Sequence, residues 1–212
     1  MKRLVLAAFA LIATPAVAQE ARPPVIVPGP VVTAPVVDEA ATARYVADFT
    51  RLCLDTGGER AAVHAAAAEA GWAPGEPEPE WRDAVDLSVF TSPDGLGGTL
   101  LTSASSPGEL EGGLIVRTCI LQPHGGSAGP RPRLETAASE AMGLPGKRTA
   151  QGLVWLVSGT RAGGFSDESA NFAAAGDTDA GFALAAQRPL MMLTLVGDAR
   201  ESGLALMRVA PE

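Results

Sequence analysis

Lysine is almost absent from this chain, and histidine and cysteine are scarce. The 212 residues contain two lysines, two histidines and two cysteines. Lysine and arginine together number 16 against 24 aspartates and glutamates, so the formal net charge is −8. An acidic surface repels phosphate backbones, and the sequence shows no basic patch of the kind that nucleic-acid binders carry. We therefore expect no nucleic-acid partner.

The sequence also argues against a metal centre, because metal-ligating residues are few, and against a nucleotide cofactor, because a phosphate-binding motif is missing. A zinc-type site needs three or four converging ligands, and neither His64 nor His124 has a carboxylate at a metal-ligand spacing. The segment 143–148 (GLPGKR) fails the phosphate-loop pattern, because Ala141 stands where its first glycine belongs and Arg148 where serine or threonine is required. The sequence predicts no metal and no cofactor.

Long hydrophobic runs are missing everywhere except at the amino terminus. Lys2 and Arg3 precede a ten-residue apolar run at 4–13, and the small residues Ala16 and Ala18 follow it. This is the pattern of a secretory signal peptide, and the run is too short to span a bilayer. We expect a signal peptide at 1–18, a periplasmic or secreted product, and no transmembrane segment after cleavage.

Five prolines lie among β-branched residues at 22–37. Each proline fixes φ and lacks a hydrogen-bond donor, so residues 19–37 are expected to form an extended, disordered leader. The remaining residues, 38–212, suit a single domain with a hydrophobic core.

Cys53 and Cys119 are the two cysteines, and an even number in an exported protein predicts a disulfide between them. The spacing contains no C-x-x-C redox motif. Because the bridge would close a loop of 66 residues, it should contribute about 4 kcal/mol to stability on the chain-entropy model.

Helical and strand patterns alternate along the predicted domain. Apolar spacing predicts helices at 38–55, 59–70 and 134–142, a short one at 168–175, and a last one at 198–207 that starts at a capping-box-like Asp198 and Glu201. Strands are predicted at 97–105, 114–121, 153–158 and 190–196. We expect an α+β fold in which an amino-terminal helical hairpin packs on an antiparallel sheet of about four to five strands, with the disulfide joining the two.

Arg117 interrupts the apolar strand predicted at 114–121, on the same face as Cys119. A buried arginine needs a partner, because an unpaired charge is costly in the interior. Three interpretations stay open: exposure at a sheet edge, a buried pair with an acidic residue, or an anion-binding pocket. Arg117, His124 and His64 are the candidate ligand-binding residues.

The segment 125–129 (GGSAG) matches the G-x-S-x-G nucleophile elbow of hydrolases. The elbow requires a helix directly after the serine, which Pro130 and Pro132 disfavour, and a histidine later in the chain, whereas both histidines precede it. We expect a loop here and name no catalytic residue.

The layout of signal peptide, proline-rich leader, cysteine-bearing helix and cysteine-bearing strand resembles the small exported proteins of unknown function from GC-rich Gram-negative bacteria. The resemblance covers residues 1–122 and implies no activity. We expect a non-catalytic periplasmic module that binds a protein, an envelope component or a small ligand. The alternative is a hydrolase that uses His124 or His64 as the base and Arg117, Arg131 or Arg133 to hold an anionic group.

Overall fold

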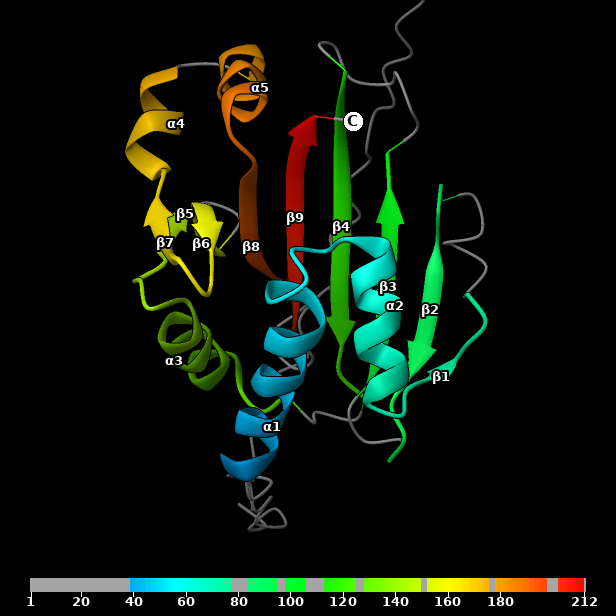
Figure 1. The fold of residues 1–212 in the computed structure, drawn as a ribbon. Helices are drawn as coiled ribbons and strands as arrows, with labels where there is room; N and C mark the ends of the chain where they lie inside the picture. The colour runs from blue at the N-terminus through cyan, green and yellow to red at the C-terminus, as the bar shows by residue number, and fades with distance from the viewer. Residues whose placement is uncertain are drawn as a thin grey trace, which may run out of the picture. The chain divides into compact units, whose positions relative to one another are not determined.

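The central feature of the computed structural model is one antiparallel sheet (Figure 1). The structure describes residues 39–77, 84–94, 98–105, 113–124, 128–149, 152–175, 178–197 and 202–211, all within one compact unit, 36–212. In these residues nine strands pair in the order β1-β2-β3-β4-β9-β8-β6-β5, and β7 shares the outer edge of β6 with β5. The predicted signal peptide and leader lie outside the described residues.

The elements have the following bounds. The strands are β1 (Ala73–Pro74), β2 (Ser88–Thr91), β3 (Thr99–Ala104), β4 (Leu114–Gln122), β5 (Lys147–Thr149), β6 (Gly152–Thr160), β7 (Gly164–Asp167), β8 (Leu190–Gly197) and β9 (Ser202–Pro211). The helices are α1 (Glu39–Phe49), the π-helical turn η1 (Thr50–Leu54), α2 (Arg60–Glu69), α3 (Arg131–Met142), α4 (Ser169–Ala175) and α5 (Thr178–Gln187).

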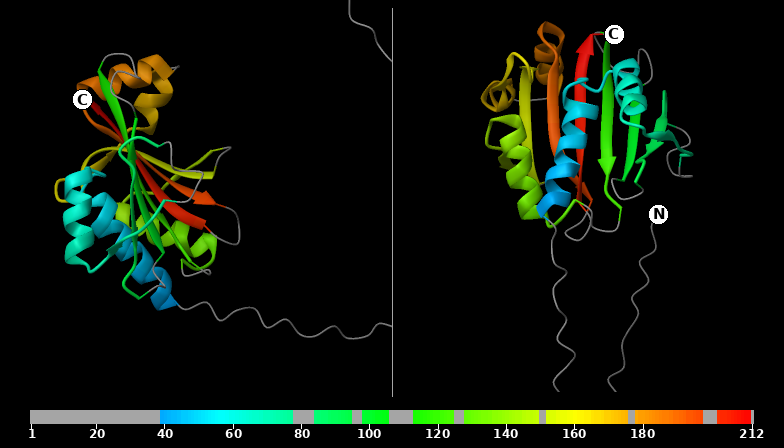
Figure 2. Two further views of the ribbon diagram at one scale, coloured as in Figure 1. Left: turned by 90° about the vertical axis from the view of Figure 1, so that its right-hand side faces the viewer. Right: turned by 60° about the horizontal axis from the view of Figure 1, so that its bottom comes forward.

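The main hydrophobic core lies between one face of this sheet and a layer of helices. Figure 1 shows α3, α1 and α2 side by side in front of the strands, and the left view of Figure 2 shows α1 and α2 on one side of the sheet with α4 and α5 at its upper end. Alternate residues of the central strands point into this core and are buried, among them Cys119, Leu121, Leu193, Leu204 and Leu206. The other face carries a smaller cluster around Leu114, Ala185 and Leu190, where α5 packs on the strands. No helix in the described ranges has the length and apolar character needed to cross a membrane.

The predicted helical hairpin on a sheet of four to five strands is wrong. The sheet has nine strands, and α1 lies mainly beside α3 and η1 instead of pairing with α2. Four of the strands, β1, β2, β5 and β7, contain only two to four residues. Such short segments carry no measurable alternation, and they exist because a neighbouring strand supplies their ladder hydrogen bonds. The broad sheet has room for α1, α2 and α3 to lie at separate positions on one face (Figure 1).

The predicted helix at 198–207 is also wrong, because residues 202–211 form β9 at the centre of the sheet. Its apolar residues fill both faces, so the run has no clear period and is compatible with either structure. The capping-box residues Asp198 and Glu201 lie outside the described residues. Two further differences are α5, which was not predicted, and α3, which begins at Arg131 because proline is well accommodated in the first helical turn.

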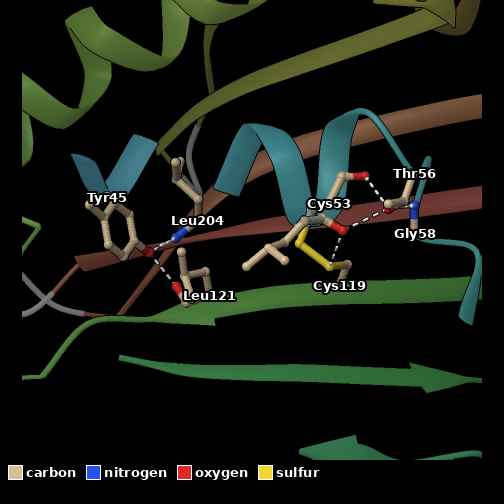
Figure 3. Close-up of a disulfide and its surroundings, with 8 residues drawn as sticks. Tyr45, Cys53, Thr56, Gly58, Cys119, Leu121 and Leu204 are labelled. Atoms are coloured by element: carbon tan, nitrogen blue, oxygen red, sulfur yellow. Dashed lines mark hydrogen bonds between the residues drawn. A yellow bond between two sulfur atoms is a disulfide. The ribbon is translucent and has the colours of Figure 1, made fainter. Parts of the chain in front are cut away.

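The disulfide between Cys53 and Cys119 ties the helical layer to β4 (Figure 3). Cys53 lies in η1 and Cys119 in the middle of β4, and both are fully buried. β4 lies between β3 and β9, which agrees with a strand that is apolar on both faces. The bridge therefore holds the end of the first helical segment against the centre of the sheet.

Tyr45 makes a second connection between α1 and the sheet (Figure 3). Its hydroxyl donates a hydrogen bond to the carbonyl oxygen of Leu121 in β4 and accepts one of 3.0 Å from the amide of Leu204 in β9. Burial raises the pKa of Tyr45, only partly offset by the Leu204 hydrogen bond, so the hydroxyl keeps its proton. One side chain thus satisfies a backbone group on each of two adjacent strands.

Replacing Tyr45 by phenylalanine should lower the free energy of unfolding by about 2 kcal/mol, because it removes the partner of a buried carbonyl and of a buried amide. Urea denaturation followed by circular dichroism measures this loss. Thr136→Ala, which removes an exposed hydroxyl from α3, is the control and should change stability by less than about 0.5 kcal/mol. Equal stability of Tyr45→Phe and the wild type would contradict this role for the hydroxyl.

Candidate functional site

A pocket of about 450 Å³ opens where three segments of the domain meet. The turn after η1 forms one wall, the end of β6 forms another, and the loop between α5 and β8 forms the third. Two sheet residues, Met191 of β8 and Arg208 of β9, complete the lining. The lining residues are Leu54, Asp55, Thr56, Gly57, Ser158, Gly159, Thr160, Arg188, Pro189, Met191 and Arg208.

The wall after η1 is built by a tight turn. The hydroxyl of Thr56 donates to the carbonyl oxygen of Leu52 at 2.7 Å and accepts from the amide of Gly58 at 3.2 Å (Figure 3). Gly57 and Gly58 both have positive φ, 60° and 70°, a conformation that favours glycine. A Cβ on Gly57 would lie 3.4 Å from Nη1 of Arg208. The turn therefore brings its backbone directly against the Arg208 guanidinium.

Two arginines share one carboxylate beside this wall. Arg117 of β4 and Arg208 of β9 are directly opposite each other in the sheet. Nη1 of Arg117 donates to Oε1 of Glu59 at 3.2 Å, and Nη1 of Arg208 donates to the same oxygen. Like charges opposite each other destabilise a strand pair, and Glu59 offsets this repulsion. We call these three residues the Arg–Glu–Arg cluster; it carries two positive charges and one negative charge.

A second ionic network lies at the α5 side of the pocket. The carboxylate of Glu168 is buried and accepts hydrogen bonds from Ser158 Oγ at 2.5 Å, Asn171 Nδ2 at 2.7 Å and Arg188 Nη2 at 2.7 Å. Burial by itself raises the pKa of Glu168, but these hydrogen bonds and the Arg188 charge outweigh it, so the pKa is lowered. The network holds Arg188 and Ser158 at the pocket, and it links α4 to β6 and to the loop before β8.

A further ion pair joins the wall after η1 to the β6–β7 turn. Arg161 Nη1 lies 3.3 Å from Asp55 Oδ1, and both side chains are about half exposed. Together with the two networks above, the arginines around the pocket number four (117, 161, 188 and 208) and the acids three (55, 59 and 168). These seven residues leave one excess positive charge in a chain whose net charge is −8.

The structure brings only one of the three candidate ligand-binding residues to this region. Arg117 belongs to the Arg–Glu–Arg cluster, as a half-buried residue of a central strand paired with an acid. His64 lies on α2 with its ring edge-on to Phe90, the ring centroids 5.0 Å apart. His124 follows β4, and its Nε2 lies 3.0 Å from Thr99 Oγ1 at an exposed position. Neither histidine lines the pocket.

Sequence reasoning missed the residues that matter most here, Arg208, Arg188 and Glu59. Arg208 was assigned to the wrong element, a predicted helix. Apolar residues also stand between Leu204, Leu206 and Arg208, so the run has no clear period that would have placed this arginine on a strand. Nothing in the sequence pairs Arg208 with Glu59, which lies 149 positions earlier.

Within the described ranges, no group of three or more histidine, cysteine or acidic side chains is arranged to hold a metal ion. The G-x-S-x-G segment lies largely outside them, since residues 125–127 are not described. Comparison with known proteins gives no match: no family model, no curated protein and no solved structure is similar to this chain.

Proposed function

We propose that this protein is an exported, non-catalytic binding module whose pocket holds a small molecule with one carboxylate and an apolar body. The observation that carries the proposal is that one pocket is lined both by two guanidinium groups, those of Arg188 and Arg208, and by apolar side chains. The apolar side chains are those of Leu54, Pro189 and Met191. The predicted signal peptide at 1–18 and the cysteine pair support an oxidising compartment outside the cytoplasm.

Arginine suits this role because its planar guanidinium presents five N–H donors in a fork that matches a carboxylate. Nη2 of Arg188 donates a hydrogen bond to Glu168, and Nη1 of Arg208 donates one to Glu59. The bond to Glu168 orients the Arg188 guanidinium and leaves its other N–H donors able to bind a ligand, while Arg208 already holds one carboxylate, that of Glu59. Charge-assisted bonds between an arginine and a carboxylate give affinity, and a bidentate arrangement adds geometric specificity.

The size and lining of the pocket favour a small, partly apolar ligand. A volume of about 450 Å³ falls within the range of about 300–1,000 Å³ that is typical of small-molecule sites. Such sites combine mostly apolar walls with a few well-placed polar groups. An apolar ligand body lying against Leu54, Pro189 and Met191, with its carboxylate at Arg208, fits that pattern.

We do not propose catalysis at this pocket. Among the described residues that line the pocket, Ser158 is the one nucleophile with a carboxylate partner, and it donates to Glu168. A general base should have a pKa near the working pH, whereas the pKa of Glu168 is lowered from its usual acidic value. Glu168 therefore acts as a poor base for Ser158, and the pair is better explained as a structural contact.

The proposal predicts that benzoate, a probe with one carboxylate and a compact apolar ring, binds measurably in isothermal titration calorimetry. Replacing Arg208 by methionine should weaken benzoate binding by at least about tenfold, because a charge-assisted hydrogen bond is lost. In this variant Glu59 keeps Arg117 as its partner, so no carboxylate is left unpaired.

Two controls make the result specific. Arg133→Met removes an arginine that pairs with Glu39 on the surface and should leave benzoate affinity unchanged. Benzyl alcohol, which has the same ring without the charge, should bind much more weakly than benzoate. The proposal fails if benzoate does not bind, or if Arg208→Met binds it as tightly as the wild type does.

A further inference from the structure

We propose that Glu59 is a built-in competitor for the ligand: its carboxylate bonds Arg208 in the position that a ligand carboxylate takes, and it moves fully to Arg117 when the ligand binds. This inference rests on the proposed function and adds a regulatory element to the same pocket. It follows from the way in which Oε1 of Glu59 is shared between two arginines.

The bonding pattern allows this exchange without leaving a charge unpaired. Glu59 accepts from both Arg117 and Arg208 through a single oxygen. If a ligand carboxylate takes over Arg208, Glu59 still has Arg117 at 3.2 Å. Each arginine then has its own carboxylate, so the repulsion between these opposite residues in the sheet is still offset. The exchange therefore costs less than breaking an isolated ion pair.

The backbone around Glu59 is fixed, whereas its side chain has room to move. Glu59 is the N-cap residue of α2, its amide donates to the carbonyl oxygen of Thr56 at 3.2 Å, and its side chain makes no capping bond to the helix. The side chain is 41% exposed, compared with 22% for Arg208 and 26% for Arg117. A rotation of Glu59 is therefore the least costly movement in the cluster.

The charges of the cluster also specify the ligand class. Arg117 and Arg208 contribute two positive charges and Glu59 one negative charge. A ligand with one carboxylate makes the cluster neutral, whereas a dicarboxylate gives it one excess negative charge. We therefore expect the wild-type protein to prefer benzoate over phthalate, which has the same ring and a second carboxylate.

Removing the competitor should tighten binding. When a binding-competent state is only partly populated, the apparent affinity falls by that fraction. In Glu59→Gln the neutral amide holds Arg208 less strongly, so benzoate should bind at least about fivefold tighter than in the wild type, and the preference for benzoate over phthalate should shrink. Glu59→Asp keeps the charge but shortens the reach by one methylene, so it should also tighten benzoate binding.

Asp55→Asn is the matched control, because it removes one negative charge from the pocket lining at a residue paired with Arg161, not Arg208. Calorimetric titration of all variants with benzoate separates the outcomes. Equal tightening by Asp55→Asn and Glu59→Gln, with no change in Glu59→Asp, would overturn the competitor and indicate a general charge effect. If Arg208→Met abolishes benzoate binding but both Glu59 variants bind benzoate as tightly as the wild type, the role of Glu59 as a competitor is wrong and the proposed function stands. If benzoate binds to no variant, the proposed function itself fails.

Discussion

A variant in which Cys53 and Cys119 are both alanine is expected to lose about 4 kcal/mol of unfolding free energy. The bridge closes a loop of 66 residues, and the cost follows from the chain entropy that the unfolded variant regains. Alanine is preferred to serine because both positions are fully buried, and a hydroxyl would need a partner there. Urea denaturation of the oxidised wild type and of the variant gives the difference.

The same variant should also lose affinity for benzoate. Cys53 lies in η1, and the residues that directly follow it, Leu54 to Gly57, form one wall of the pocket. Without the bond to β4 this wall is held only by its hydrogen bonds and its packing. The wild type refolded in the presence of reductant, so that both thiols stay free and unmodified, provides an independent control. If the alanine variant loses less than about 1 kcal/mol of unfolding free energy, the bridge constrains the unfolded chain far less than the loop length implies.

Replacing Glu168 by alanine is expected to lower the free energy of unfolding by about 3 kcal/mol, the second largest effect. The carboxylate is buried, with a side-chain exposure of 4%, and three side chains donate to it. Breaking a buried ionic network from one side is costly because the remaining groups lose their partner. Glu140→Ala, the same substitution at an exposed position of α3, should change stability by less than about 0.5 kcal/mol.

The pH dependence of stability identifies the charge of Glu168 as the cause. Its pKa in the folded protein is lowered from the ordinary value of 4.5, so its contribution is complete above about pH 4.5 and is lost as the pH falls through the folded pKa. Urea midpoints measured from pH 7 down to pH 3 should therefore fall less steeply for Glu168→Gln than for the wild type. Parallel curves for the two proteins would contradict the assignment.

The parts of the fold that could be predicted are those with a strong local signal. β3, β4, β6 and β8 were expected close to their observed positions, because long apolar runs bounded by turn residues identify buried strands. The end of α3 at Gly143, with φ of 65°, follows from the ability of glycine to adopt the left-handed conformation. Cys119 could be predicted as the disulfide partner of Cys53 because it is the other cysteine of the two in the sequence.

The candidate site was predictable only in part, because its charges come from separate elements. Arg117 attracted attention as an arginine within an apolar strand. Arg208 did not, because β9 was assigned as a helix, and Arg188 did not, because the loop before β8 has no pattern of its own. Predicting the pocket would have required the strand order, in which β9 lies between β4 and β8.

By itself, the sequence determined the covalent link between η1 and β4, the apolar central strands and the acidic balance of the chain. The tertiary structure alone decided that β9 pairs with β4 in the register that sets Arg208 opposite Arg117, and that Glu59 reaches both. The physical reason is that the pairing of β4 with β9, whose partner residues lie 83 to 97 positions apart, depends on the burial of both sheet faces together, and no local pattern of residues records it.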